Sequence, residues 1–265
     1  MSKQLRALCA WSGVITLVFM FIGMIVAGWL PVPSPNMTSG QVVAMYVEKQ
    51  DKIRFFSMMN LCSAGWSCMW VAAISAQLRR IESGRSPLWT YLQLSAGICS
   101  SFLFCVQALT WTVASFRPER HPEITQVFND MAFLWFLMPF VFATVGCLAI
   151  GAAILEDKSR VPVFPRWVGY ANIWFAIGFP MAMFTTYAKT GPFAWDGMFP
   201  WWIPVIDYTI WSVVMSWATA RASNRQHDEE GEAMAIDMAY ALRHTAGSTD
   251  HSGQNTLAQA PAAQG

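Results

Sequence analysis

The side chain with the clearest chemical potential in this sequence is a carboxylate, Asp207, which lies inside an apolar stretch at about 201–220. A charged side chain within a membrane span costs a few kcal/mol or more, so it calls for a partner or a function. Two interpretations stay open. Asp207 lines a cavity and binds a cation, a proton or a polar head group, or it pairs with Arg54, Lys189 or Asn60 and locks the helices together.

Four other polar or helix-breaking residues fall at a comparable depth in neighbouring apolar stretches. With a rise of about 1.5 Å per residue, Asp207 is roughly 9 Å deep, and Asn60 and Gln107 are at similar levels. Pro139 and Pro180 also lie near this level, and a proline inside a helix frees a carbonyl group and kinks the chain. In the first of the two interpretations of Asp207, this layer lines a cavity that opens toward the outer side of a membrane; in the second, it belongs to the contacts that lock the helices together.

The 14 tryptophans exceed what two interfacial belts need. Five of them sit deep in the apolar stretches: Trp66, Trp70, Trp135, Trp174 and Trp211. They either wall a pocket for an apolar ligand, or fill the core and face lipid. The candidate ligand-binding residues are Asp207, Asn60, Gln107, Trp66 and Trp211.

Composition places the chain in a bilayer, because 55% of its residues are hydrophobic and 12% are charged, against about 25% charged in soluble domains. A membrane-spanning helix needs about 20 mostly apolar residues. Six stretches qualify: about 8–30, 55–78, 88–116, 131–155, 167–188 and 201–220. We therefore predict an all-α, polytopic membrane protein whose residues 1–220 form a bundle of six transmembrane helices.

Two polar segments accompany these spans. Thr38 or Ser39 can cap a short amphipathic helix at about 40–50, which is expected on the outer surface. Residues 221–265 form a polar tail that is expected to be cytoplasmic and mostly disordered, with one short helix at about 228–243. That helix is either a loosely formed part of the tail or a docking site for a cytoplasmic partner.

Basic residues predict the orientation of the chain, since they are enriched on the cytoplasmic side of membrane proteins. With the N-terminus inside, ten lie inside: Lys3, Arg6, Arg79, Arg80, Arg85, Lys158, Arg160, Arg166, Arg221 and Arg225. Six lie outside: Lys49, Lys52, Arg54, Arg117, Arg120 and Lys189. Both termini are therefore expected in the cytoplasm.

Several kinds of activity find no support in the sequence. There is no nucleotide-binding GxxxxGK[ST] pattern, no HExxH and no GxSxG. Asp207 has no second intramembrane carboxylate for acid–base or metal chemistry. The net charge of +1 gives no reason to expect nucleic acid as a partner. We expect no catalytic residues, no cofactor and no metal, and an enzyme acting alone is not the favoured interpretation.

A local pattern covers about residues 31–80: a proline-containing stretch, a short capped helix, Lys52-Ile53-Arg54-Phe55 entering the second span and Arg79-Arg80 ending it. In this layout the chain resembles the uncharacterised bacterial six-helix inner-membrane proteins found among domains of unknown function. The resemblance implies a fold and an inner-membrane location, and it implies no activity.

Two functions are compatible with these features. The chain either binds or transports a small apolar or amphipathic molecule through an outer-half cavity around Asp207, or it is a non-catalytic accessory subunit of a larger membrane complex. The first predicts a pocket with Asp207 on its wall. The second predicts a filled bundle with a large apolar face. In either case the expected partners of the protein are the lipid bilayer together with a small hydrophobic ligand or other membrane subunits.

Overall fold

The computed structural model describes residues 2–257, with side chains described through residue 238, and within that range the regular structure is helical with no strand. Five helical stretches in it are long and apolar enough to cross a membrane: Lys3–Ala27, Gln50–Ile81, Leu88–Phe116, Pro122–Glu156 and Arg166–Thr186. The chain is thus a multi-pass helical membrane protein. Its residues divide into two compact units, Met1–Ser223 and Asn224–Gly265.

The first helices begin and end at residues suited to those positions. Helix α1 (Lys3–Ala27) starts after Ser2, whose hydroxyl accepts the N–H of Leu5, and ends at Gly28 in the left-handed conformation (φ 63°). Helix α2 (Ser39–Glu48) has a capping box between Thr38 and Gln41. The structure thus has a short helix in this segment, and Thr38 is its cap.

Prolines interrupt three of the later helices. Helix α5 (Pro122–Leu137) stops just before Pro139, and α6 (Phe140–Glu156) starts immediately after it. Helix α7 (Arg166–Gly178) gives way to the 3₁₀ helix η1 (Phe179–Thr186), which contains Pro180. A short π-helix, η2 (Met198–Trp202), contains Pro200 and leads into α8. A proline removes a backbone N–H and collides with the carbonyl four residues earlier, so each break has a local cause.

Helix α8 (Ile203–Leu257) contains the apolar stretch in which Asp207 lies, and it continues past residue 220. The sequence predicted a mostly disordered tail from residue 221, whereas the structure has helix up to residue 257. No proline occurs between Pro204 and Pro261, and the segment is rich in alanine, glutamate, glutamine, arginine and methionine, which favour helix. Residues 258–265 of the expected tail lie outside the described residues.

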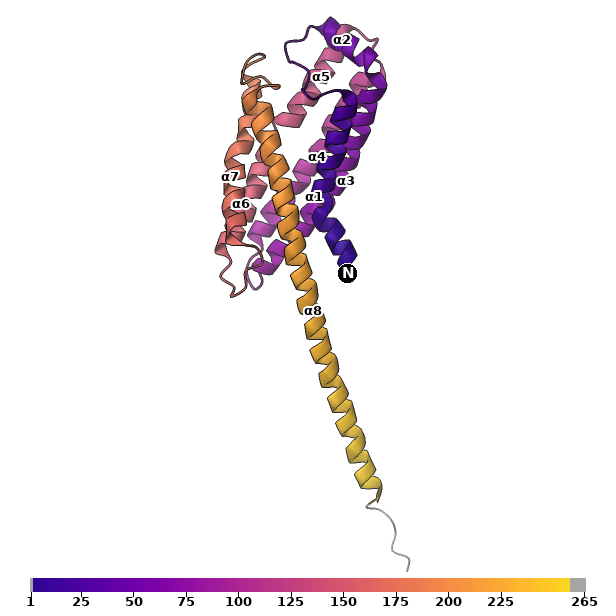
Figure 1. Ribbon diagram of the computed structural model, residues 1–265, viewed down its shortest axis with the longest axis vertical. Coiled ribbons are helices and arrows are strands. Elements are labelled where there is room, and N and C mark those ends of the chain that lie inside the picture. Colours follow the sequence, from indigo (N-terminus) through magenta and orange to yellow (C-terminus); the bar gives the residue numbers. More distant parts are fainter. Residues whose placement is uncertain (1, 258–265) are drawn as a thin grey trace, which may run out of the picture. The chain divides into compact units, whose positions relative to one another are not determined.

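Helices α1, α3 (Gln50–Ile81) and α4 (Leu88–Phe116) pack side by side through small and hydroxyl side chains (Figure 1). The hydroxyls of Ser67 on α3 and Ser101 on α4 are 2.8 Å apart. Closer to the loop that joins these helices, the hydroxyl of Ser75 donates to Oε1 of Gln93. Such contacts between small side chains let the backbones of membrane helices approach closely.

Two aromatic clusters fill the interior of the Met1–Ser223 unit. The larger one centres on Trp111, whose ring lies 4.9 Å from Phe56, 5.5 Å from Trp29 and 5.3 Å from Phe133. The other joins Trp70 of α3 to Trp211 of α8, which meet edge to face at 4.8 Å. Rings in these arrangements contribute more than their buried area alone.

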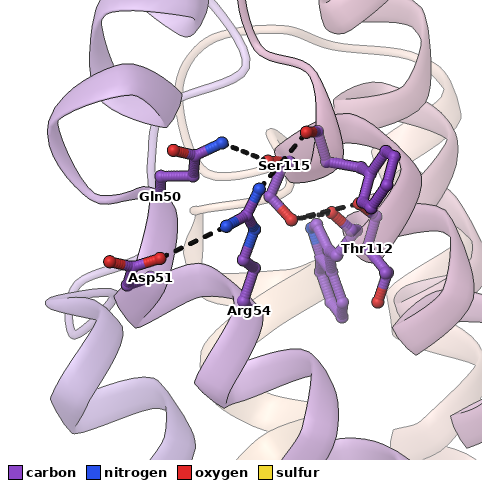
Figure 2. Close-up of polar contacts among 7 residues, drawn as sticks. Gln50, Asp51, Arg54, Thr112 and Ser115 are labelled. Carbon is purple, nitrogen blue, oxygen red and sulfur yellow. Dashed lines mark hydrogen bonds and ion pairs between the residues drawn. The ribbon is translucent and has the colours of Figure 1, made fainter.

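At one end of the α3–α4 pair, side chains of α3 satisfy backbone carbonyls that α4 leaves open (Figure 2). Nε2 of Gln50 donates to the carbonyl of Ser115 at 2.9 Å, and Arg54 donates to the carbonyl of Phe116 at 3.2 Å. Arg54 also contacts Asp51 at 3.3 Å. The last carbonyls of a helix carry partial negative charge, so a guanidinium there is favourable.

The loop after α6 is organised by the buried carboxylate of Asp157. Its oxygens accept the N–H of Ser159 at 2.9 Å, the hydroxyl of Ser159 at 2.6 Å and the N–H of Val163 at 3.0 Å. Burial by itself raises the pKa of Asp157, but these hydrogen bonds and the charge of Arg166 outweigh it and hold the pKa below its ordinary value of 3.8.

This lowered pKa predicts a pH dependence. A carboxylate whose pKa falls on folding stabilises the folded state above its unfolded pKa, and this contribution is lost as pH falls through the folded pKa. Wild type should therefore unfold at a higher temperature than Asp157→Asn above about pH 5, and the gap should close below about pH 4. Unfolding midpoints of both proteins across this range provide the measurement. A gap that persists at low pH would show that the charge of Asp157 is unimportant.

A candidate binding groove between α4, α6 and α8

One apolar space in the described bundle lies where α5 breaks into α6. It is a cavity of about 60 Å³ between these helices, α4 and α8, with one residue from α1. Its lining is Met20, Ser100, Leu103, Phe104, Gln107, Trp135, Phe136, Pro139, Phe140, Ala143, Val205 and Tyr208. Trp135 is 38% exposed, so the wall formed by α5 lies at the surface of the bundle.

One polar atom stands out on this apolar wall. The side chain of Gln107 is 2% exposed, and its Oε1 has no hydrogen-bond partner in the part of the chain whose side chains are described. A buried carbonyl oxygen without a donor costs about 1–3 kcal/mol, and in a membrane no bulk water can relieve that cost. Gln107 therefore carries an unused, buried acceptor within the wall of the cavity.

A second cavity of about 30 Å³ adjoins the first, because Ser100, Ala143 and Tyr208 line both. It continues between α3, α4, α6 and α8 toward Gln93 and Trp211. The two cavities together are called the groove below. An engineered cavity that holds benzene measures about 150 Å³, so the groove suits a narrow chain or a small head group without rearrangement, and a larger body only if its walls part.

Of the five candidate residues from the sequence, Gln107 and Trp211 line the groove. Trp211 is also tied to α7, since its Nε1 donates to Oδ1 of Asn172 at 2.9 Å. Trp66 lies outside the groove lining, and its ring packs against Phe19 of α1 at 6.4 Å. The other deep tryptophans include both buried and exposed side chains, since Trp70 is 1% exposed and Trp174 is 70% exposed.

Asn60 is fully buried beside the groove rather than in its lining. Neither of its amide atoms has a hydrogen-bond partner among the described side chains. The register fixed by Ser67 with Ser101 places Asn60 opposite Ala108 and therefore next to Gln107 along α4. Two buried amides with unused hydrogen-bonding atoms thus occupy one layer of the α3–α4 interface.

Asp207 lies one residue before Tyr208 but is not part of the groove lining. Its half-buried carboxylate packs against Gly178 at the end of α7, where a Cβ would collide with Oδ2. No hydrogen bond or ion pair to Asp207 occurs among the described residues. Arg54, one of its expected partners, instead contacts Asp51 and the end of α4.

Tyr208 lines both cavities but is not among the residues predicted from the sequence. The signal was present, because Tyr208 is three residues before Trp211 and so shares its face of α8. In the sequence, Phe136 and Phe140 are aromatic residues on either side of Pro139. Their role as a wall depends on the helix break, which turns both rings toward the same space.

Two larger hollows, of about 290 and 480 Å³, lie at the ends of helices. The first is bordered by Glu82, Arg85 and Glu156, and the second by Gln41, Glu48 and Lys49. Their charged rims suit hydrated surface depressions. The groove is smaller, but it is the one that combines an apolar wall with an unsatisfied buried acceptor, so it is the better candidate site.

Comparisons with known proteins add no relative: no protein-family model, no curated protein and no solved structure matches the chain. Among the described residues, no group of three or more histidine, cysteine, aspartate or glutamate side chains could hold a metal ion.

Proposed function

We propose that this protein is an inner-membrane protein of six spans, with α8 contributing the sixth span and both termini in the cytoplasm. Its function is the binding or transport of a small apolar or amphipathic molecule. The excess of basic residues on one side of the spans supports the orientation. The prolines that break α5 from α6 and α7 from η1 support movement, since broken helices line the sites of many transporters.

The observation that carries this function is the unsatisfied Oε1 of Gln107 on the apolar wall of the groove. A molecule with an apolar body and one hydroxyl or amine would donate a hydrogen bond to this oxygen and place its body against Phe104, Phe136 and Phe140. Because the α5 wall of the groove lies at the surface of the bundle, the molecule would enter sideways from the lipid rather than from water.

A groove-filling variant tests this proposal. Ala143 lines both cavities, so Ala143→Phe should fill them. Gly65→Phe adds a larger side chain at an exposed helical position with no neighbour within 4 Å of its Cβ, and it serves as the matched control. Native mass spectrometry of each protein, gently extracted from its own membrane, would measure any retained small molecule.

Wild type and Gly65→Phe should retain one defined molecule at a fixed ratio, and Ala143→Phe should lose at least about 90% of it, equivalent to a tenfold or larger drop in affinity. Gln107→Leu, which keeps the volume and removes the acceptor, should weaken retention roughly tenfold. Equal retention by all four proteins would exclude the groove as the binding site.

A second function, that of an accessory subunit, has one observation in its favour. In the Asn224–Gly265 unit, α8 exposes three large apolar side chains, Met234, Ile236 and Met238, which are 72%, 68% and 66% exposed. The same extraction distinguishes the two functions, because co-purification of other polypeptides in fixed ratio, with an empty groove, would favour the subunit.

A further inference from the structure

Asp207 places a carboxylate against Gly178, where α7 continues directly into η1. Gly178 is the last residue of α7, and the carboxylate occupies the space that any larger residue at position 178 would need. A carboxylate at this position, in an apolar segment and without a cationic partner among the described residues, is therefore incompletely neutralised.

One backbone carbonyl close in sequence to Gly178 also loses its regular donor. Pro180 has no N–H, so the carbonyl of Ala176 lacks its regular donor four residues later in the chain. The helix tightens into η1 directly after Gly178. A carboxylate and a carbonyl without its regular donor are both oxygen ligands, which hard cations prefer. Sodium sites in membrane transporters are built from unwound helices in this manner.

We propose that Asp207, with the backbone at the break between α7 and η1, forms a binding site for one small monovalent cation: Na⁺, K⁺ or H⁺. A single carboxylate neutralises one unit charge, and a divalent ion would leave an excess positive charge in an apolar segment. This site is separate from the groove. Since Asp207 and Tyr208 are adjacent on α8, a cation that draws α8 toward α7 would also move a groove wall.

The test measures the thermal unfolding midpoint of the full-length protein in detergent, in NaCl, KCl or choline chloride at equal ionic strength. An ion that binds only the folded state stabilises it, so a saturating alkali ion should raise the midpoint by roughly 5 °C over choline. Asp207→Asn should abolish this rise. Asp196→Asn, which removes a carboxylate from the loop before η2, should keep it.

The proton is tested in choline chloride alone. If H⁺ is the ligand, lowering the pH from about 8 to about 5 should raise the midpoint of wild type relative to Asp207→Asn. The nearby titratable side chains are Cys147 on α6 and Tyr208 on α8. Both are present in the two proteins, so their difference reports Asp207.

Two further variants make the outcome decisive. Gly178→Ala places a methyl group where the carboxylate sits and should also remove the cation response, which covers the case in which Asp207→Asn does not fold. Ala143→Phe blocks the groove and should leave the response intact, so a failure of the groove proposal is distinguishable from a failure of this one. The absence of any response to Na⁺, K⁺ or H⁺ in wild type, or an equal response in Asp207→Asn, overturns the cation site.

Discussion

Replacing Glu82 with alanine is expected to lower the free energy of unfolding by about 3 kcal/mol. Glu82 is 5% exposed and lies in the turn before α4, which has no cap from its own N-cap residue. Its carboxylate instead accepts the N–H of Trp89 at 3.0 Å, the N–H of Thr90 at 2.9 Å and the hydroxyl of Thr90 at 2.6 Å. A negative charge at a helix N-terminus adds to these three bonds.

The measurement is chemical unfolding in mixed micelles, with two matched variants. Glu82→Gln keeps the volume but turns an NH₂ group toward a backbone donor, so it should still lose about half of the stability lost in Glu82→Ala. Glu156→Ala removes an exposed carboxylate that accepts only Nε1 of Trp89, and it should cost about 1 kcal/mol or less. A stability of Glu82→Gln equal to wild type would show that the carboxylate does not cap α4.

Replacing Gly13 with alanine is expected to destabilise the bundle by about 2 kcal/mol, because the added methyl group would overlap the ring of Trp70. A Cβ at position 13 would lie 2.8 Å from Nε1 of Trp70 and closer still to two ring carbons. Trp70 is 1% exposed and is held edge to face by Trp211, so the ring has little room to move.

A second glycine and a control position make this prediction specific. Gly97→Ala should also destabilise the bundle, since its Cβ would lie 2.6 Å from Cγ1 of Val71. Gly65 is exposed on α3 with nothing within 4 Å of a Cβ, so Gly65→Ala should raise stability by up to about 1 kcal/mol. The thermal unfolding midpoints of the three variants, compared with that of wild type, test this prediction. Equal effects at positions 13 and 65 would refute the tight contact with Trp70.

The elements with strong local signals could be predicted from the sequence. Thr38 with Gln41 forms a capping box, and Pro139 and Pro180 break helices through their missing N–H groups, so these boundaries follow from single residues. The apolar stretches give the helical, multi-pass fold in the same way. The helical continuation of α8 past residue 220 differs from the disordered tail expected from polar composition, and the segment contains no proline before Pro261.

The rotation of each helix about its axis could not be predicted. Lipid and protein core are both apolar, so hydrophobic periodicity does not distinguish the two faces of a membrane helix. Trp70 and Trp174 look alike in sequence, yet one is buried against Trp211 and the other is exposed. For the same reason the sequence placed Gln107, which lines the groove, and Asp207, which faces Gly178, in one site.

The hydrogen bonds between α3 and α4 also determine which parts of the bundle are free to move. Gln50 with Ser115, Ser67 with Ser101 and Ser75 with Gln93 connect the two helices at both ends and in the middle. Sliding one helix past the other by a single residue would break all three contacts together. The pair therefore acts as a rigid support, and any widening of the groove for a larger molecule has to come from the opposite wall, where α5 and α6 meet at Pro139.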